Sequence, residues 1–257
     1  MSDYIIKTDD SLIVVTKQKQ MPVIHSVSVD TEDSTYIRKL INTMQLQPVP
    51  RQIMAIEANA EAIVDNIYIE EWGDAINNIN TIRVNMNELM PVLQENSVPN
   101  ELISNMNAAI TRLNQAVMQQ NTQQAITQAN QIMMYVADML DYFDVMVPTD
   151  LNRLNFFARQ IIIEAENNNW DQVNANYLEA NQVWERLKPE LGEQYSNDVN
   201  EFDLALSNLA EPIDSRNYQM TVDNANILLD RLDFLSNDFA EQNFPPETPP
   251  QNTSPQA

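Results

Sequence analysis

The sequence predicts a mainly α-helical protein that consists of two tandem four-helix antiparallel bundles, preceded by a small β-hairpin and a helix. Three observations support this prediction. Apolar residues recur at helical spacing from residue 51 to residue 240. The apolar pattern of the first half returns in the second half. Finally, only 2 glycines occur in 257 residues, whereas tight hairpins and phosphate-binding loops need glycine where φ is positive.

The N-terminal segment has a different pattern from the rest of the chain. Residues 11–16, SLIVVT, and residues 22–30, PVIHSVSVD, indicate two strands joined by a turn at KQKQM. Apolar residues from Ile37 to Met44 are spaced as in an amphipathic helix, which the prolines at 48 and 50 should end. Because an isolated hairpin is marginally stable in water, we expect it to pack against the helices.

An internal repeat is anchored by two tryptophans and two prolines. Trp72 and Trp170 lie 98 residues apart, and so do Pro91 and Pro189. The apolar positions between these anchors also match. After the prolines the offset shortens to 96, which pairs Met106 with Phe202, Leu113 with Leu209, and Phe143 with Phe239. The two-residue deletion falls in an expected loop, where changes of length are tolerated.

The repeat predicts how the chain is divided. Residues 1–50 would form the hairpin and helix, residues 51–147 the first helical repeat, and residues 148–241 the second. Residues 242–257 are rich in proline and are expected to be disordered. The expected helices can form either two antiparallel bundles or one continuous eight-helix array. The sequence leaves both arrangements open.

Charge and hydropathy limit the classes of partner. The chain has 14 Lys and Arg against 37 Asp and Glu, a formal net charge of −23. Nucleic acids and anionic membranes attract clustered cations, so we expect no nucleic-acid partner. A basic protein partner fits this charge, although solubility or adaptation to a salty habitat explains it more simply. No apolar run of 18 residues occurs, so no transmembrane segment is expected.

Several kinds of active site are excluded by missing residue types. Without cysteine there is no thiolate metal site and no cysteine nucleophile. His25 is the only histidine, so the repeats can form neither a di-iron Glu-x-x-His pair nor a catalytic triad with histidine. We therefore expect no enzyme, no cofactor, and no catalytic or metal-binding residues. Glycan hydrolysis by two carboxyl groups is the chemistry that survives this filter.

Methionine and tryptophan are the remaining candidates for a site. Thioethers suit Cu(I), but the second repeat has Trp or hydrocarbon residues at four matching positions, which favours a core role for Met86, Met106, Met133 and Met139. A ligand-stacking platform could be formed by Trp72, Trp170 and Trp184. The first two stand at expected helix starts, however, where a hydrophobic staple is the more usual role.

The segments NNWDQV, with Trp184 further on, and EEWGDAI resemble parts of helical-bundle lipoproteins and surface proteins of low-GC Gram-positive bacteria. The resemblance covers roughly residues 51 to 240. It implies a cell-envelope protein and supplies no catalytic residues. The chain lacks a signal and a lipid-bearing cysteine, so the expected location is extracytoplasmic if an export signal has been removed and cytoplasmic otherwise.

The leading functional expectation is a non-catalytic interaction or scaffold protein of the cell envelope. It would present an acidic, polar helical surface to a protein partner, and the oligomeric state is left open. The alternative is a helical bundle that binds a small ligand or a metal cation. Buried polar residues clustered within one bundle would favour the alternative. An apolar interior with an exposed apolar groove would favour the interaction protein.

Overall fold

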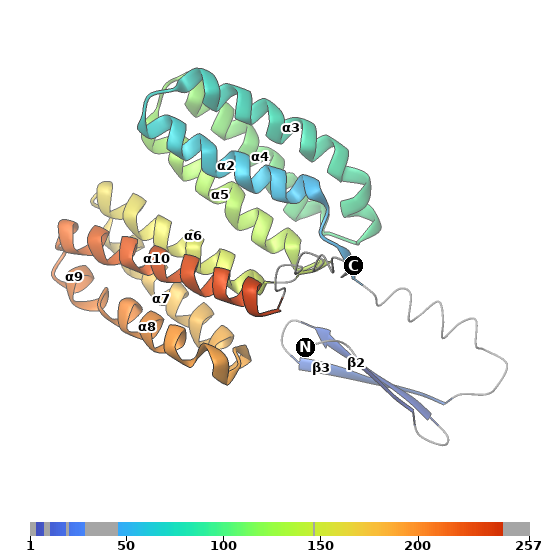
Figure 1. Cartoon of the computed structure of the whole chain (residues 1–257). Helices are drawn as coiled ribbons and strands as arrows, with labels where there is room; N and C mark the ends of the chain where they lie inside the picture. Colours follow the sequence, from blue (N-terminus) through green and yellow to red (C-terminus); the bar gives the residue numbers. More distant parts are fainter. Residues whose placement is uncertain (1–3, 8–10, 19–20, 29–45, 146, 244–257) are drawn as a thin grey trace, which may run out of the picture. The chain divides into compact units, whose positions relative to one another are not determined.

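A computed structural model describes residues 4–7, 11–18, 21–28, 46–145 and 147–243. The chain divides into two compact units, residues 1–47 and residues 48–257, which are described separately (Figure 1). The mainly helical fold expected from the sequence is confirmed. The expected helix between residues 31 and 46 lies almost entirely outside the described residues.

The first unit contains a three-stranded antiparallel sheet. Its strands are β1 (Tyr4–Lys7), β2 (Ser11–Gln18) and β3 (Met21–Ser28), in the order β1-β2-β3. The β2–β3 pair is the expected hairpin, with Ser11 opposite Ser28. Both strands extend into the segment predicted as a turn, and β1 was not predicted. The packing of this sheet against the helices stays a prediction.

The second unit is a succession of helices joined by short turns. The first repeat comprises α2 (Arg51–Tyr68), α3 (Trp72–Glu95), α4 (Asn100–Met118) and α5 (Thr122–Leu140). The second comprises α6 (Thr149–Glu166), α7 (Trp170–Leu187), α8 (Ser196–Ser207), α9 (Ala210–Asp214) and α10 (Tyr218–Asn243), with short 3₁₀ turns η1 (Lys188–Glu190) and η2 (Glu193–Tyr195) after α7. The two-residue strands β4 (Gln47–Pro48) and β5 (Phe143–Asp144) precede α2 and follow α5 in the chain.

The helix boundaries repeat at the offsets seen in the sequence. Helices α2 and α6 start 98 residues apart, as do α3 and α7, whereas α5 and α10 start 96 residues apart. Helix ends are also alike. Glu70 and its counterpart Asn168 both have positive φ, and the following amide donates to a carbonyl five residues back, at 2.8 and 2.9 Å. This is the Schellman motif, formed here without glycine.

Each repeat has its own buried apolar cluster. Most matched positions are buried in both, as in Ile53 and Leu151 or Leu89 and Leu187, whereas Tyr177 is only partly buried where Ile79 is fully buried. Among the described residues, the buried polar side chains are those of Asn130, Arg153 and Thr221. The interior is therefore almost entirely apolar. The predicted domain boundaries between the repeats stay a prediction, because both repeats belong to one compact unit.

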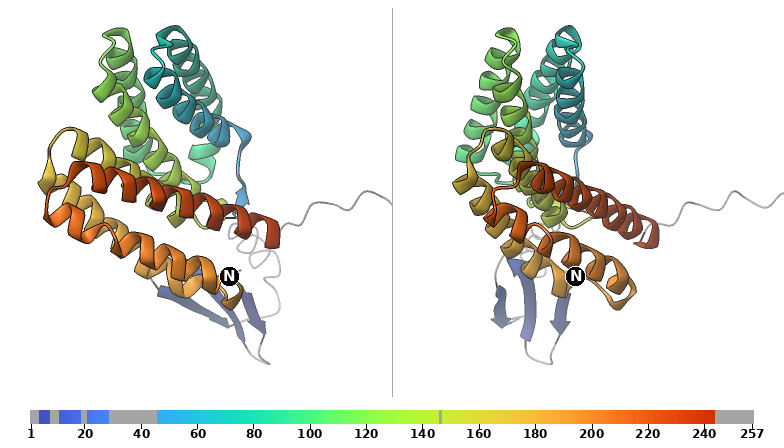
Figure 2. Two further views of the ribbon diagram at one scale, coloured as in Figure 1. Left: turned by 60° about the vertical axis from the view of Figure 1, so that its left-hand side comes forward. Right: turned by 90° about the vertical axis from the view of Figure 1, so that its left-hand side faces the viewer.

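The third helix of the second repeat differs from the expected single helix, because it is divided into α8 and α9. Pro212 accounts for the break: it has no amide hydrogen, and its ring clashes with the carbonyl four residues earlier, at Asn208. That carbonyl accepts a hydrogen bond of 2.9 Å from Asn224 Nδ2 of α10 instead. Both views of Figure 2 show α10 running alongside α6 and α8.

One buried guanidinium joins the two repeats where α5 packs on α6. Arg153, with a side chain only 7% exposed, contacts Asp138 at 2.8 Å, Asp141 at 2.5 Å and Asp150 at 2.9 Å. Asp150 also pairs with Arg186 of α7. Burial raises the pKa of Asp150, but the two guanidinium groups outweigh burial and bring this pKa below its ordinary value. The cluster is thus a paired structural network.

Replacement of Arg153 by methionine should destabilise the protein by about 3 kcal/mol, because three carboxylates lose their shared partner. The matched control is Arg159→Met on the same helix. Arg159 is 29% exposed and pairs with Glu61 at 3.3 Å, so this change should cost less than about 1 kcal/mol. Urea denaturation measures both free energies. Equal losses for the two variants would contradict the role assigned to Arg153.

Candidate functional site

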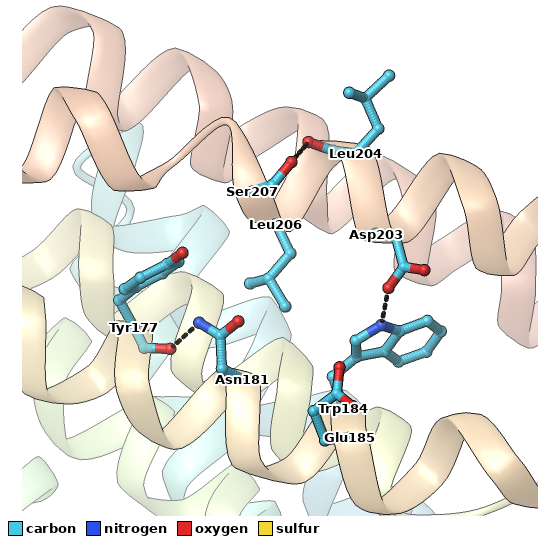
Figure 3. Close-up of a pocket in the computed structure, with 8 residues that line it drawn as sticks. All are labelled: Tyr177, Asn181, Trp184, Glu185, Asp203, Leu204, Leu206 and Ser207. Carbon is cyan, nitrogen blue, oxygen red and sulfur yellow. Dashed lines mark hydrogen bonds between the residues drawn. The ribbon is translucent and has the colours of Figure 1, made fainter.

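An open groove with a volume of about 510 Å³ lies between α7 and α8 (Figure 3). The side chains from α7 are spaced so that Tyr177, Asn181 and Glu185 follow one face of the helix. The opposite wall comes from α8. The complete lining consists of Tyr177, Asn181, Trp184, Glu185, Asp203, Leu204, Leu206 and Ser207. The groove is therefore built by two helices of the second repeat alone.

The base of the groove is apolar. Trp184 and Leu206 belong to the buried cluster of the second repeat and are 1% and 3% exposed. The Trp184 ring lies 4.2 Å from that of Phe202, measured between centroids. Leu204 of α8 is 62% exposed, and its side chain points away from α7 (Figure 3). Trp184 is thus too deeply buried to stack on a ligand, which removes it from the platform that the sequence suggested.

Asp203 organises the groove wall. Its Oδ1 accepts a hydrogen bond of 2.6 Å from Trp184 Nε1, and its Oδ2 lies 2.6 Å from Lys188 Nζ. Burial raises the pKa of Asp203, but Lys188 and Trp184 together outweigh burial and lower it. In return, the hydrogen bond to Asp203 raises the pKa of Lys188. Both oxygens of this carboxylate are therefore occupied within the protein.

Two of the remaining polar groups of the groove each use a side-chain donor within the protein, whereas the Tyr177 hydroxyl makes no hydrogen bond to the described residues. Asn181 Nδ2 donates to the carbonyl of Tyr177 at 2.8 Å, and Ser207 Oγ donates to the carbonyl of Leu204 at 2.9 Å. Within the described part of the chain, no hydrogen bond reaches Asn181 Oδ1 or the Glu185 carboxylate. Glu185 interacts with Lys188 and helps to raise the pKa of that amine. The groove therefore offers donors as well as acceptors to whatever binds it.

The first repeat does not carry the same surface residues. At the offsets that align the buried positions, Asn181, Glu185, Asp203 and Leu204 correspond to Arg83, Asn87, Asn107 and Ala108. The residues at the base of the groove are apolar and buried in both repeats, because Trp184 and Leu206 correspond to Met86 and Ile110. The exposed lining has thus diverged while the core positions have remained apolar. A comparison of surface positions between the repeats would have pointed to this groove.

The other sequence candidates lie elsewhere. His25 is in β3, paired with Val14 of β2. The methionines at 86, 106, 133 and 139 are buried in the first apolar cluster. Trp72 and Trp170 are each the first residue of a helix and belong to different clusters. Over the residues that the structure describes, no group of His, Cys, Asp and Glu is arranged to hold a metal ion.

None of the described helices combines the length and the apolar character needed to cross a membrane. Comparisons with protein-family models, with curated proteins and with solved structures give no match for this chain. Its function is therefore argued from the chemistry of its own residues. The α7–α8 groove brings apolar and polar side chains together on the surface of the second repeat.

The indole N–H of Trp184 should report the ionisation of Asp203. Because the pKa of Asp203 is lowered, its contribution to stability is present above its ordinary pKa of about 3.9 and is lost as the pH falls through the lowered value. The Trp184 indole signal in NMR spectra should shift over that same interval. Trp170 is an internal control, because its Nε1 donates to the neutral Asn168 Oδ1 at 2.6 Å. Asp203→Asn should abolish the shift of Trp184, and equal titration of both indoles would contradict the assignment.

Proposed function

We propose that the protein is a non-catalytic interaction or scaffold protein that binds a segment of a protein partner in the α7–α8 groove. The observation that carries the proposal is the combination of an apolar base and free hydrogen-bonding groups in one groove, next to an exposed leucine on α8. The interior beneath it is closed and apolar. An apolar centre bordered by polar groups is the usual anatomy of a protein–protein interface.

A protein segment fits the groove better than a small ligand does. The volume of about 510 Å³ is within the range of small-molecule sites, which keeps a small ligand as the second candidate. Leu204, however, is exposed on the outer side of α8 next to the groove, where a partner segment that extends beyond the groove could cover it. Grooves between two helices commonly receive amphipathic helices through such contacts.

The charge of the protein favours a basic partner. With a net charge of −23, the surface attracts cationic segments and repels anionic ones, which acts mainly on association rate and specificity. The α7–α8 groove does not favour hydrolysis of a glycan, because a general acid needs a raised pKa and that of Asp203 is lowered. We also propose that the protein belongs to the cell envelope, and this part of the proposal rests on the resemblance of the NNWDQV segment alone.

A photoreactive amino acid at position 204 should capture the partner in cells that produce the protein. The matched control is position 84 in α3, where Val84 is similarly exposed, at 56%, but lies outside the groove. The captured protein is identified by mass spectrometry and purified. Leu204→Ala should then weaken its binding by more than about 1 kcal/mol, whereas Val84→Ala should have no effect.

Both substitutions replace exposed side chains, so the free energy of unfolding should change by less than about 0.5 kcal/mol. Binding of the partner should also weaken as a rising salt concentration shortens the Debye screening length from about 10 Å to about 3 Å, because the attraction between the acidic protein and a basic partner is then screened. Equal capture from positions 204 and 84, or binding that Leu204→Ala leaves unchanged, would refute a role of the groove.

A further inference from the structure

We propose that the exposed face of α10 is a docking surface for a helix of a basic protein partner. The partner helix would carry apolar residues at intervals of seven positions, with Lys or Arg between them. This surface lies on the last helix of the second repeat, outside the α7–α8 groove (Figure 1). The inference therefore goes beyond the proposed function and does not depend on it. Three observations on α10 support it.

The first observation is a line of exposed apolar side chains on α10. Met220, Ile227 and Phe234 are 46%, 47% and 58% exposed and follow one another at intervals of seven residues. Among the described helices, no other carries more than two exposed large apolar side chains. Seven residues are nearly two turns of an α-helix, so the three side chains form one line, here called the α10 seam. Such spacing is typical of the seam along which a second helix packs in a coiled coil.

The second observation is that the fold does not require the α10 seam. α10 packs on α6 and α8, and its buried apolar residues, none of which belongs to the seam, are Ala225, Leu228, Leu232 and Leu235. At the offset of 96, the three seam positions correspond to Gln124, Gln131 and Asp138 of α5. The first repeat thus forms its bundle with polar residues at these positions. The apolar seam is a property of the second repeat's surface and not of the shared core.

The third observation is the negative charge along the seam. Asp223 and Asp230 are exposed and each follow a seam residue by three positions, and the exposed Asp233 immediately precedes Phe234. In a pair of coiled helices, the residue three positions after a seam residue also faces the partner. No ion pair between described residues involves these three carboxylates. A helix that lies on the seam is therefore stabilised by Lys or Arg opposite them.

These charges favour a basic helix over a second copy of the chain. Two copies of α10 packed on each other would bring identical carboxylates together, between molecules that each have a net charge of −23. Arg231 does not offset these charges, because it is paired with Glu201 of α8. Its guanidinium lies 5.8 Å from the centroid of the Phe234 ring, which nevertheless stays largely exposed.

The test uses the full-length protein and a fluorescently labelled peptide of several heptads, with Leu at the first and Lys at the fourth position of each heptad and Ala and Gln elsewhere. Fluorescence anisotropy should show saturable binding. Ile227→Gln together with Phe234→Gln should weaken binding about tenfold or more, because two covered apolar side chains are lost. The matched control is Val84→Gln together with Leu178→Gln. It removes side chains that are 56% and 51% exposed on other helices, and it should leave the affinity unchanged.

Two further peptides separate the effects of spacing and charge. One has the same composition with its leucines at irregular intervals, and the other has Glu in place of Lys at the same spacing. Both should bind about ten times more weakly than the first peptide, or weaker still. Asp223→Asn together with Asp230→Asn should weaken binding of the Lys peptide about threefold, because two exposed ion pairs are lost.

Three results would overturn the inference: no binding of the Lys peptide, equal binding of the peptide with irregular leucines, or an affinity that the Ile227 and Phe234 substitutions leave intact. Analytical ultracentrifugation tests the other occupant. The original protein should not form a dimer through the seam. A dimer that Ile227→Gln together with Phe234→Gln abolishes would show that the seam receives a second copy, which contradicts the proposal.

Discussion

The burial of one apolar stripe on every helix is the constraint on which the rest of the structure depends. Both repeats have to bury the same helical faces, so the positions that match between them are apolar in both, as Ala60 and Ala158 are. The exposed faces carry no such requirement and have diverged. Trp184 replaces the buried Met86 without leaving the core, whereas the residues above it differ in charge and size. The groove is therefore a surface feature carried on a duplicated core.

The same constraint explains why the array begins at α2 and ends at α10. At the junction α6 buries a second face against α5, and α5 presents a matching one. The end helices carry small or polar residues at the corresponding positions, as terminal repeats do to stay soluble. In α2, Ala58, Asn59 and Asp65 correspond to the buried Phe156, Phe157 and Ile163 of α6, and in α10, Asp230 and Asp233 correspond to Met134 and Ala137 of α5.

Periodicity predicted the helices, the hairpin and the repeat, because each depends on residues close together in sequence. It missed β1, whose four residues are too few to show alternation, and the break before Pro212, which interrupts an otherwise helical pattern. It could not place Arg153, whose partners Asp138 and Asp141 lie on another helix. The groove was missed for the same reason. Its walls come from α7 and α8, and only folding brings Glu185 and Leu204 to one site.

The central claim is that the second repeat carries a binding groove on a core that it shares with the first. The most direct measurement compares the original protein with a variant that carries three residues of the first repeat's surface in the second repeat. Its substitutions are Asn181→Arg, Glu185→Asn and Leu204→Ala. Each new residue already occupies the corresponding position of the first repeat. We expect binding of the purified partner to be lost while the unfolding midpoint in urea stays that of the original protein. Retained binding, or loss of binding together with the folded state, would contradict the separation of core and groove.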